Sequence, residues 1–265
     1  MQRLYEYVKA EFSQTWLPSH DHTHHMRVWS YAKILTEVLN REGHHFSKTK
    51  LEQLIIAVFF HDTGLTRTLD ASHGKESREI CRKFLARQPN LLKDHFDEML
   101  DAVEKHDDKS YGDFPVAERN QPDDILTMLT VCDDLDAYGA IGVFRYLEIY
   151  FHRGIPFQLI PVKVIVNLKK RHQYLIQHYG DLKDFILAQQ NRYQFTVDFY
   201  NALGKQQHAP DNISPNEGPL IVANLLLEKV LREKIHITEI AFSIENLPLD
   251  EYTIHYFRQL QSELK

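Results

Sequence analysis

The chain has 265 residues, of which 43% are hydrophobic and 26% are charged, and its formal net charge at pH 7 is −6. These values are typical of a globular protein with one large domain or two smaller ones, and they exclude collagen-like, disordered and disulfide-scaffold classes. The acidic balance argues against binding to the phosphate backbone of a nucleic-acid polymer. The unusual feature of the composition is its sixteen histidines.

Apolar residues recur at three- and four-residue spacing along most of the chain, which predicts an all-α fold. In the first half, apolar stripes predict helices around residues 4–12, 28–39, 51–59, 80–85, 96–103 and 125–129. The last of these helices is expected to begin at Asp123. Residues 110–122 are rich in turn-forming residues and are expected to form a loop.

The helical pattern continues beyond residue 156. Helices are predicted over residues 161–178, 181–204, 218–233 and 249–264, with the best linker candidate at 209–218. We expect a first domain over residues 1–155 and a helical extension over residues 156–265 that packs on it. The basic run Lys169-Lys170-Arg171 is interpreted as a solvated helix face, and no chemistry is predicted for the extension.

No segment of the sequence predicts membrane insertion or export. The longest apolar run, residues 54–60, is far shorter than the ~20 residues that span a bilayer. Charged residues from Arg3 onward occupy the N-terminus, where a signal peptide would be hydrophobic. Cys81 and Cys132 form no CxxC pair, which suits a reducing compartment. We therefore expect a cytoplasmic protein.

Five apolar stripes of the first half are continued by a side chain of a metal-ligating type. Residues three and four apart share a helix face, so these side chains are expected to point toward one core. They are His24, His61 with Asp62, His73, His106 and Asp133. One such residue is readily explained as a hydrogen-bonded core histidine or a capping aspartate. The same explanation is improbable for five helices that each point a His or Asp toward one core.

Burying an ionisable group without a partner costs several kcal/mol, whereas one cation would satisfy all of these side chains together. A set of imidazoles and carboxylates without thiolate suits Mn, Fe, Co, Ni or Zn better than an iron–sulfur cluster or a calcium cage. The stripes therefore predict a metal site.

Three fragments, in chain order, resemble the HD superfamily of metal-dependent phosphohydrolases, whose pattern is H…HD…D on an all-helical bundle. Residues 20–28 (HDHTHHMRV) resemble the opening motif, residues 59–64 (FFHDTG) the defining dyad, and residues 131–142 (VCDDLDAYGAIG) the closing motif. A further fragment, HGKES at residues 73–77, is similar to the family's "HE..S" element, with Gly74 in place of Glu. The resemblance covers roughly residues 18–150.

The resemblance implies an HD-domain-like helical bundle that binds a divalent metal ion, namely Mn, Fe, Ni, Co, Zn or Mg. The implied ligands are His24, His61, Asp62 and Asp133. In the opening motif the ligand lies three residues before an Arg-Val pair, which selects His24 over His20, His22 and His25. Asp136, one turn after Asp133, is expected to support the site.

The activity implied by the resemblance is hydrolysis of a phosphoester or phosphoanhydride bond in a nucleotide-like small molecule. The candidate catalytic residues are Asp62, which could orient the attacking water, and His106, which could act as a general acid. The candidate substrate-binding residues are Arg27, His73, Lys75 and Lys109. A single metal ion is favoured, because four ligands already suffice for one ion with open positions.

Two other functions stay open at this point. Some HD proteins, such as inositol oxygenase, use H…HD…H…H…D to hold two irons, and this chain could supply that set. A non-catalytic nucleotide-binding or signalling module is the second alternative. The expected partner is a small phosphate or nucleotide substrate, with no nucleic-acid polymer and no membrane, and a homodimer is compatible with the sequence.

Overall fold

The structure is a computed structural model that describes the whole chain except residues 71, 89–95, 109–120, 209–217, 245–248 and 265. The described residues contain helices and no β-strand, which confirms the predicted all-α class. They form two compact units. The first unit comprises Met1–Thr15, His20–Asp136 and Lys170–Ile186, and the second comprises Trp16–Ser19, Ala137–Lys169 and Leu187–Lys265. The domain boundary at residue 155 stays a prediction.

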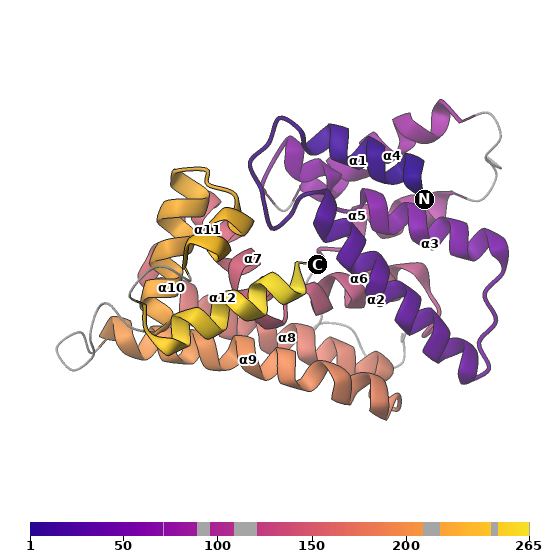
Figure 1. The fold of residues 1–265 in the computed structure, drawn as a ribbon. Coiled ribbons are helices and arrows are strands. Elements are labelled where there is room, and N and C mark those ends of the chain that lie inside the picture. Colours follow the sequence, from indigo (N-terminus) through magenta and orange to yellow (C-terminus); the bar gives the residue numbers. More distant parts are fainter. Residues whose placement is uncertain (71, 89–95, 109–120, 209–217, 245–248, 265) are drawn as a thin grey trace. The chain divides into compact units, whose positions relative to one another are not determined.

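The α-helices that lie wholly within the first unit occur where the apolar stripes predict them, and a 3-10 turn (Thr63–Thr66) follows the His61-Asp62 dyad (Figure 1). They are α1 (Gln2–Phe12), α2 (His22–Arg41), α3 (Lys48–Phe60), α4 (His73–Ala86), α5 (Asp97–Lys105) and α6 (Ile125–Asp136). Helix α6 begins two residues later than expected, because the Asp124 carboxylate accepts a hydrogen bond of 2.9 Å from the backbone N–H of Thr127. The expected loop at 110–122 lies almost entirely outside the described residues.

Side-chain caps fix the start of the two helices that lead into the HD-like motifs. The Asp21 carboxylate accepts a hydrogen bond of 2.8 Å from the N–H of Thr23, at the start of α2. The Ser47 hydroxyl accepts one of 3.1 Å from the N–H of Lys50, at the start of α3. Each bond satisfies a backbone donor that has no partner within its helix. Asp21 thereby sets the register that places His24 in the first turn of α2.

Helices α3 and α6 form the centre of the first unit. Helix α2 packs against both of them, α5 packs against both as well, and α4 packs on α5. Every residue of α6 except Leu126 is buried, including the aspartates at 133, 134 and 136. Because a buried carboxylate is costly without a partner, this helix requires cations or hydrogen-bond donors around its C-terminal half.

The second unit contains helices, or parts of helices, that follow Asp136 in the chain. They are α7 (Gly139–His152), the first half of α8 (Ile160–Tyr179), most of α9 (Lys183–His208), α10 (Pro219–Leu225), a π-helical segment (Leu226–Arg232), α11 (Ile237–Ile244) and α12 (Glu251–Glu263). The predicted helix at 218–233 corresponds to α10 and the π-helical segment, and α11 was not predicted. The predicted linker lies outside the described residues, apart from Gly218.

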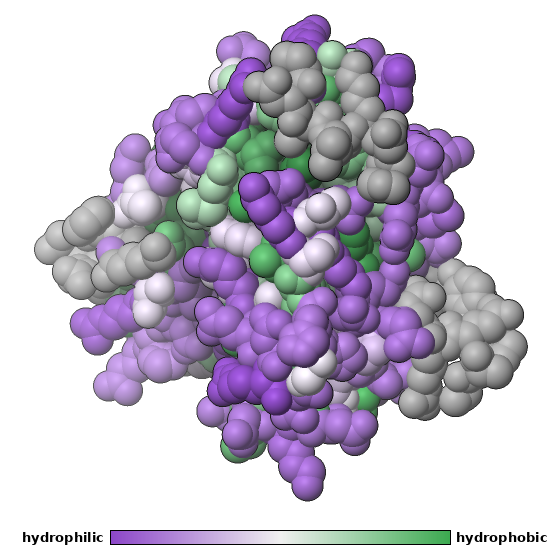
Figure 2. Space-filling model, turned by 90° about the vertical axis from the view of Figure 1, so that its right-hand side faces the viewer, coloured by the Kyte–Doolittle hydropathy of each residue, from purple (hydrophilic) through white to green (hydrophobic). Residues whose placement is uncertain are grey.

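None of the described helices combines the length and the hydrophobicity that crossing a bilayer requires. On the face of the molecule shown in Figure 2, hydrophilic residues predominate among those described.

Candidate metal centre

Six buried side chains from α2 to α6 converge in the first unit. They form two groups, and the members of each have ligand atoms within 4.8 Å of one another. The first group is His24, His61, Asp62 and Asp133, and the second is Asp62, His73 and His106. None of the six residues is more than 4% exposed. The structure therefore brings together every residue of the first half that continues an apolar stripe with a ligand-type side chain.

The first group has the spacing of ligands around one ion. The Nε2 atom of His24 lies 3.0 Å from Nε2 of His61, 3.4 Å from Oδ2 of Asp62 and 3.5 Å from Oδ1 of Asp133. The His61 Nε2 atom lies 3.6 and 3.7 Å from the same two oxygens. Two ligands at about 2.1 Å from an ion and at right angles to each other are themselves about 3 Å apart, so these four atoms fit one small cation.

The second group uses the other oxygen of Asp62. Its Oδ1 atom lies 3.0 Å from Nε2 of His106 and 3.3 Å from Nε2 of His73, and these two nitrogens are 3.4 Å apart. Asp62 thus directs one carboxylate oxygen into each group. That arrangement is typical of a carboxylate that bridges two ions.

Hydrogen bonds fix the same tautomer in all four rings. The Nδ1–H of His61 donates to the carbonyl of Val58 (2.8 Å), and the Nδ1–H of His106 donates to the carbonyl of Val103 (2.8 Å). His73 donates from Nδ1 to the Asp70 carbonyl (2.9 Å), and His24 donates from Nδ1 to the Asp136 carboxylate (2.8 Å). In a neutral ring whose Nδ1 carries the proton, Nε2 carries a lone pair that can accept a hydrogen bond or bind a metal ion. Within each group, two such lone pairs face each other, which a cation between them would stabilise.

The carboxylates of the two groups favour positive charge on two of the facing rings. Burial disfavours the imidazolium of His61, yet the charge of Asp62 and the hydrogen bond to Asp133 raise its pKa. Burial likewise opposes protonation of His73, but Asp62 raises the pKa of this ring to about 9. Burial disfavours the Asp62 carboxylate, but His61 and the other facing rings hold its pKa well below the ordinary value. The site therefore attracts positive charge, as a cation site must.

Arg27 and Asp136 support His24 from behind. The Asp136 carboxylate accepts from Nδ1 of His24 and also from Nε and Nη2 of Arg27, at 2.8 and 2.9 Å. A carboxylate in this position orients a ligating imidazole and raises its basicity, as expected for Asp136. The sequence predicts Arg27 to bind a substrate phosphate, but the structure engages two of its donors with Asp136. Its partner lies 109 positions away in the sequence, so no local pattern could reveal it.

His25 and Lys75 lie outside both groups. His25 is buried, and its Nδ1–H donates to the same Val58 carbonyl at 3.0 Å, so the ring belongs to neither group. Lys75 is exposed in the first turn of α4, and Lys109 lies outside the described residues. Gly74 stands where the family motif has Glu because a Cβ atom there would lie 2.1 Å from the carbonyl oxygen of Glu104.

Arg171 is the residue of this centre that the sequence interpretation missed. The basic run Lys169-Lys170-Arg171 predicts a solvated face, and this is wrong for Arg171, which is 9% exposed and whose Nη1 atom is hydrogen-bonded to Oδ1 of Asp134. The same atom lies 3.7 Å from Oδ2 of Asp133. The signal that could have found it is the one used for the histidines: Arg171 continues the apolar stripe of Leu168 and Leu175.

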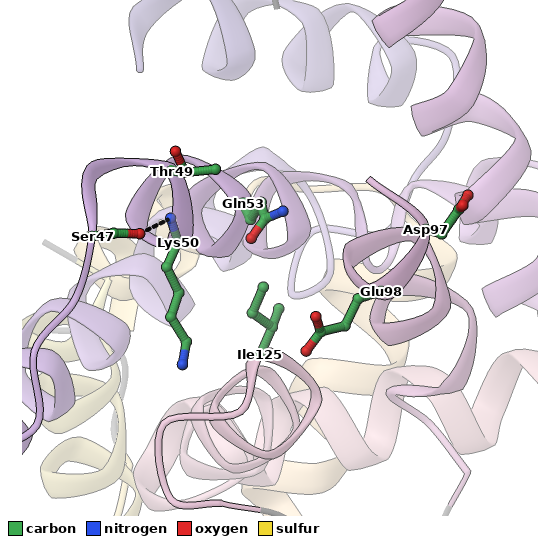
Figure 3. Close-up of a pocket in the computed structure, with 7 residues that line it drawn as sticks. All are labelled: Ser47, Thr49, Lys50, Gln53, Asp97, Glu98 and Ile125. Atoms are coloured by element: carbon green, nitrogen blue, oxygen red, sulfur yellow. Dashed lines mark hydrogen bonds between the residues drawn. The ribbon is translucent and has the colours of Figure 1, made fainter. Parts of the chain in front are cut away.

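A separate cavity of about 500 Å³ lies at the other end of α3, close to the first residues of α5 and α6. Figure 3 shows Lys50 and Glu98 on either side of Ile125 within it. Its described lining contains no histidine, and Lys50 is paired with Asp123. Gln53 is the lining residue of α3 that is nearest to His61 in the sequence. Because a helix rises 1.5 Å per residue, the eight positions between them correspond to about 12 Å along the helix axis, so this cavity is separate from the cluster.

The family model described as "HD domain" matches residues 22–140. Comparisons with curated proteins and with solved structures found no match. The matched segment includes His24, the His61-Asp62 dyad and Asp133, which the structure brings into one buried group. Residues 22–140 therefore match the HD domain model, and they contain a buried His/Asp cluster that fits a divalent metal ion.

Proposed function

We propose that this protein is a metal-dependent phosphohydrolase that cleaves a phosphoester or phosphoanhydride bond in a small, nucleotide-like molecule. The single observation that carries the proposal is the arrangement of His24, His61, Asp62 and Asp133 inside an HD domain. A divalent ion bound there would lower the pKa of a coordinated water to about 7 and polarise a phosphoryl oxygen.

Asp62 has the central role in this proposal. Its carboxylate is held between the two groups by His24 on one side and by His106 on the other. Because this carboxylate stays ionised, it can accept a hydrogen bond from the attacking water and orient that water toward phosphorus. The imidazoles around Asp62 are buried, and those of His61 and His106 are hydrogen-bonded to backbone carbonyls. They would therefore hold the Asp62 carboxylate in place before the substrate binds.

We further propose a second ion, held by Asp62, His73 and His106. The support is that the Nε2 atoms of His73 and His106 both lie close to Oδ1 of Asp62 and to each other. This departs from the single ion that the sequence favours, and it makes His106 a ligand rather than a general acid. A shell of three side chains is smaller than one of four, so we expect the second ion to bind more weakly than the first.

The substrate and setting of the reaction are further parts of this proposal. The net charge of −6 supports a free small molecule rather than a nucleic-acid polymer as substrate. The free cysteines Cys81 and Cys132 are compatible with the cytoplasm. Manganese is the ion we would test first, because imidazole and carboxylate ligands suit it.

The experiment is a hydrolysis assay on the chelator-stripped chain, with and without Mn²⁺, over nucleotides, cyclic nucleotides, sugar phosphates and inorganic polyphosphates. We expect release of phosphate, pyrophosphate or nucleoside from at least one class only when Mn²⁺ is present. A folded Asp62→Ala variant is expected to be inactive. Tight nucleotide binding without turnover in Mn²⁺ would instead favour a non-catalytic binding module.

A di-iron oxygenase is the second candidate function, and the bridged pair of groups is the observation that favours it. The same six side chains could hold two irons with Asp62 between them. The discriminating measurements are the iron content of protein purified without added metal and the consumption of dioxygen in the presence of polyols. Two irons per chain with oxygen uptake, and no phosphate release with any ion, would select the oxygenase.

A further inference from the structure

Helix α8 contributes a charged side chain to the HD core. Arg171 is 9% exposed, whereas its neighbours Lys169 and Lys170 are exposed. It lies on the buried stripe of the helix, which consists of Val164, Leu168, Leu175 and Tyr179. Residues 170–179 belong to the same compact unit as the metal centre, although they lie beyond the segment matched by the HD family model.

The guanidinium of Arg171 contacts two consecutive aspartates of α6. Its Nη1 atom donates a hydrogen bond to Oδ1 of Asp134, which is 1% exposed. The same nitrogen lies 3.7 Å from Oδ2 of Asp133. The other oxygen of Asp133, Oδ1, faces the Nε2 atoms of His24 and His61 at 3.5 and 3.7 Å. The Asp133 carboxylate is thus held with one oxygen toward a cation of the protein and the other toward the imidazoles.

Among the described residues, the buried aspartates of the centre fall into two that pair with arginines and two that face the imidazoles. Four aspartates are buried there, at positions 62, 133, 134 and 136. Arg27 pairs with Asp136, and Arg171 pairs with Asp134. The carboxylates that face the imidazoles of the first group are then Asp62 and Asp133.

We propose that Arg171 is a positioning residue of the metal centre, which holds Oδ2 of Asp133 so that Oδ1 is presented to the ion. Asp134 anchors the guanidinium, and a planar guanidinium is the group that can direct N–H donors at two neighbouring carboxylates. A partner behind a metal ligand commonly changes metal affinity by 10–100-fold. This inference rests on the proposed metal centre, and it makes part of α8 necessary to it.

The test compares Mn²⁺ binding to the chelator-stripped full chain by isothermal titration calorimetry. Arg171→Lys keeps the positive charge but loses the fork of donors. The double variant Arg171→Met with Asp134→Asn removes both charges of the pair, so the net charge near the ion is unchanged and Asp134 is not left as a buried carboxylate without its arginine. Lys170→Met is the matched control, because it removes an exposed cation from the adjacent position of the same helix.

Binding is measured well below the unfolding temperature of each variant, so that a purely structural role would leave the Kd unchanged. We expect the Kd for the tighter Mn²⁺ ion to rise 10–100-fold in Arg171→Lys and in the double variant, and to change less than twofold in Lys170→Met. Wild-type Kd values in both Arg171 variants would overturn this inference alone. A wild-type chain that takes up no Mn²⁺ would overturn the metal centre and this inference together.

Discussion

Arg27 holds Asp136 with two of its nitrogens, and the same carboxylate accepts the Nδ1–H of His24. A series of hydrogen bonds therefore runs from Arg27 to the Nε2 atom that faces the other ligands. The third nitrogen of Arg27, Nη1, donates a hydrogen bond of 3.1 Å to the hydroxyl of Thr23, one turn earlier in α2. All three nitrogens of the guanidinium therefore have a partner. This geometry suits Arg27 to keeping Asp136 aligned with the His24 ring.

The first prediction concerns this support. Arg27→Ala is expected to weaken Mn²⁺ binding by about 10–100-fold, because Asp136 would lose the donors that keep it aligned with His24. The measurement is the Mn²⁺ Kd of the stripped protein. Arg82→Ala is the control, since Arg82 has a side chain that is 61% exposed and pairs only at the surface with Glu79. An unchanged Kd combined with a raised KM would instead restore Arg27 as a phosphate-binding residue.

The second prediction concerns the contact that sets His73 beside His106. Gly74 meets the backbone of α5 at Glu104, so Gly74→Ala must push α4 and α5 apart. We expect this change to lower the free energy of unfolding by roughly 1–3 kcal/mol, as overpacking does, and to weaken the second Mn²⁺ site.

Gly204→Ala is the control, and its effect on the free energy of unfolding is expected to have the opposite sign. Gly204 is inside α9, and its added Cβ would lie 3.4 Å from Pro161, an ordinary contact. This substitution is expected to raise the free energy of unfolding by about 0.5–1 kcal/mol. Urea unfolding of both variants measures the difference. Equal stability of the two would show that the α4–α5 approach is not tight.

The third prediction concerns the thiols. Cys81 and Cys132 are fully buried, and burial raises the pKa of both thiols far above the ordinary value. The thiolate is the reactive form, so both cysteines are expected to resist alkylation at pH 8 in the folded chain and to react in denaturant. Mass spectrometry after iodoacetamide treatment measures this. Rapid labelling of Cys132 in the native protein would contradict the burial of α6 on every side.

The fourth prediction concerns metal removal. An ion that binds the folded chain at 100 times its Kd stabilises it by about 2.7 kcal/mol. For a chain of this size the Tm is expected to rise by roughly 5–10 °C when Mn²⁺ is added to the stripped protein. The His61→Ala variant is expected to show little of this shift. An equal shift in wild type and variant would indicate that Mn²⁺ acts elsewhere on the chain.

The sequence could predict which histidines and aspartates cluster because each continues an apolar stripe of its own helix. His61 and His106 follow the ends of α3 and α5, and each donates to the carbonyl three residues before it, a relationship that is local in the chain. The helices of the first unit were predictable for the same reason. The glycine in place of the motif's glutamate could not be explained from sequence, because its cause is a backbone contact with residue 104.

The roles of the two arginines depended on contacts across long sequence separations. Arg27 and Asp136 are 109 positions apart, and Arg171 and Asp134 are 37 apart. Arg171 was also concealed by its two lysine neighbours, which suggested an exposed face. Its position on the stripe with Leu168 is present in the sequence, but arginine is not a metal-ligating residue type, so the stripe alone does not mark it as part of the centre.

The most direct test of the account is the number of ions that the chain binds with and without Asp62. This residue directs one oxygen into each group, so a single substitution should affect both. Equilibrium dialysis against Mn²⁺, followed by elemental analysis, gives the ions per chain for wild type and for a folded Asp62→Ala variant. We predict two ions per wild-type chain, one tighter than the other, and loss of high-affinity binding in the variant. No bound ion in the wild type, or equal occupancy in the two proteins, would contradict the metal centre.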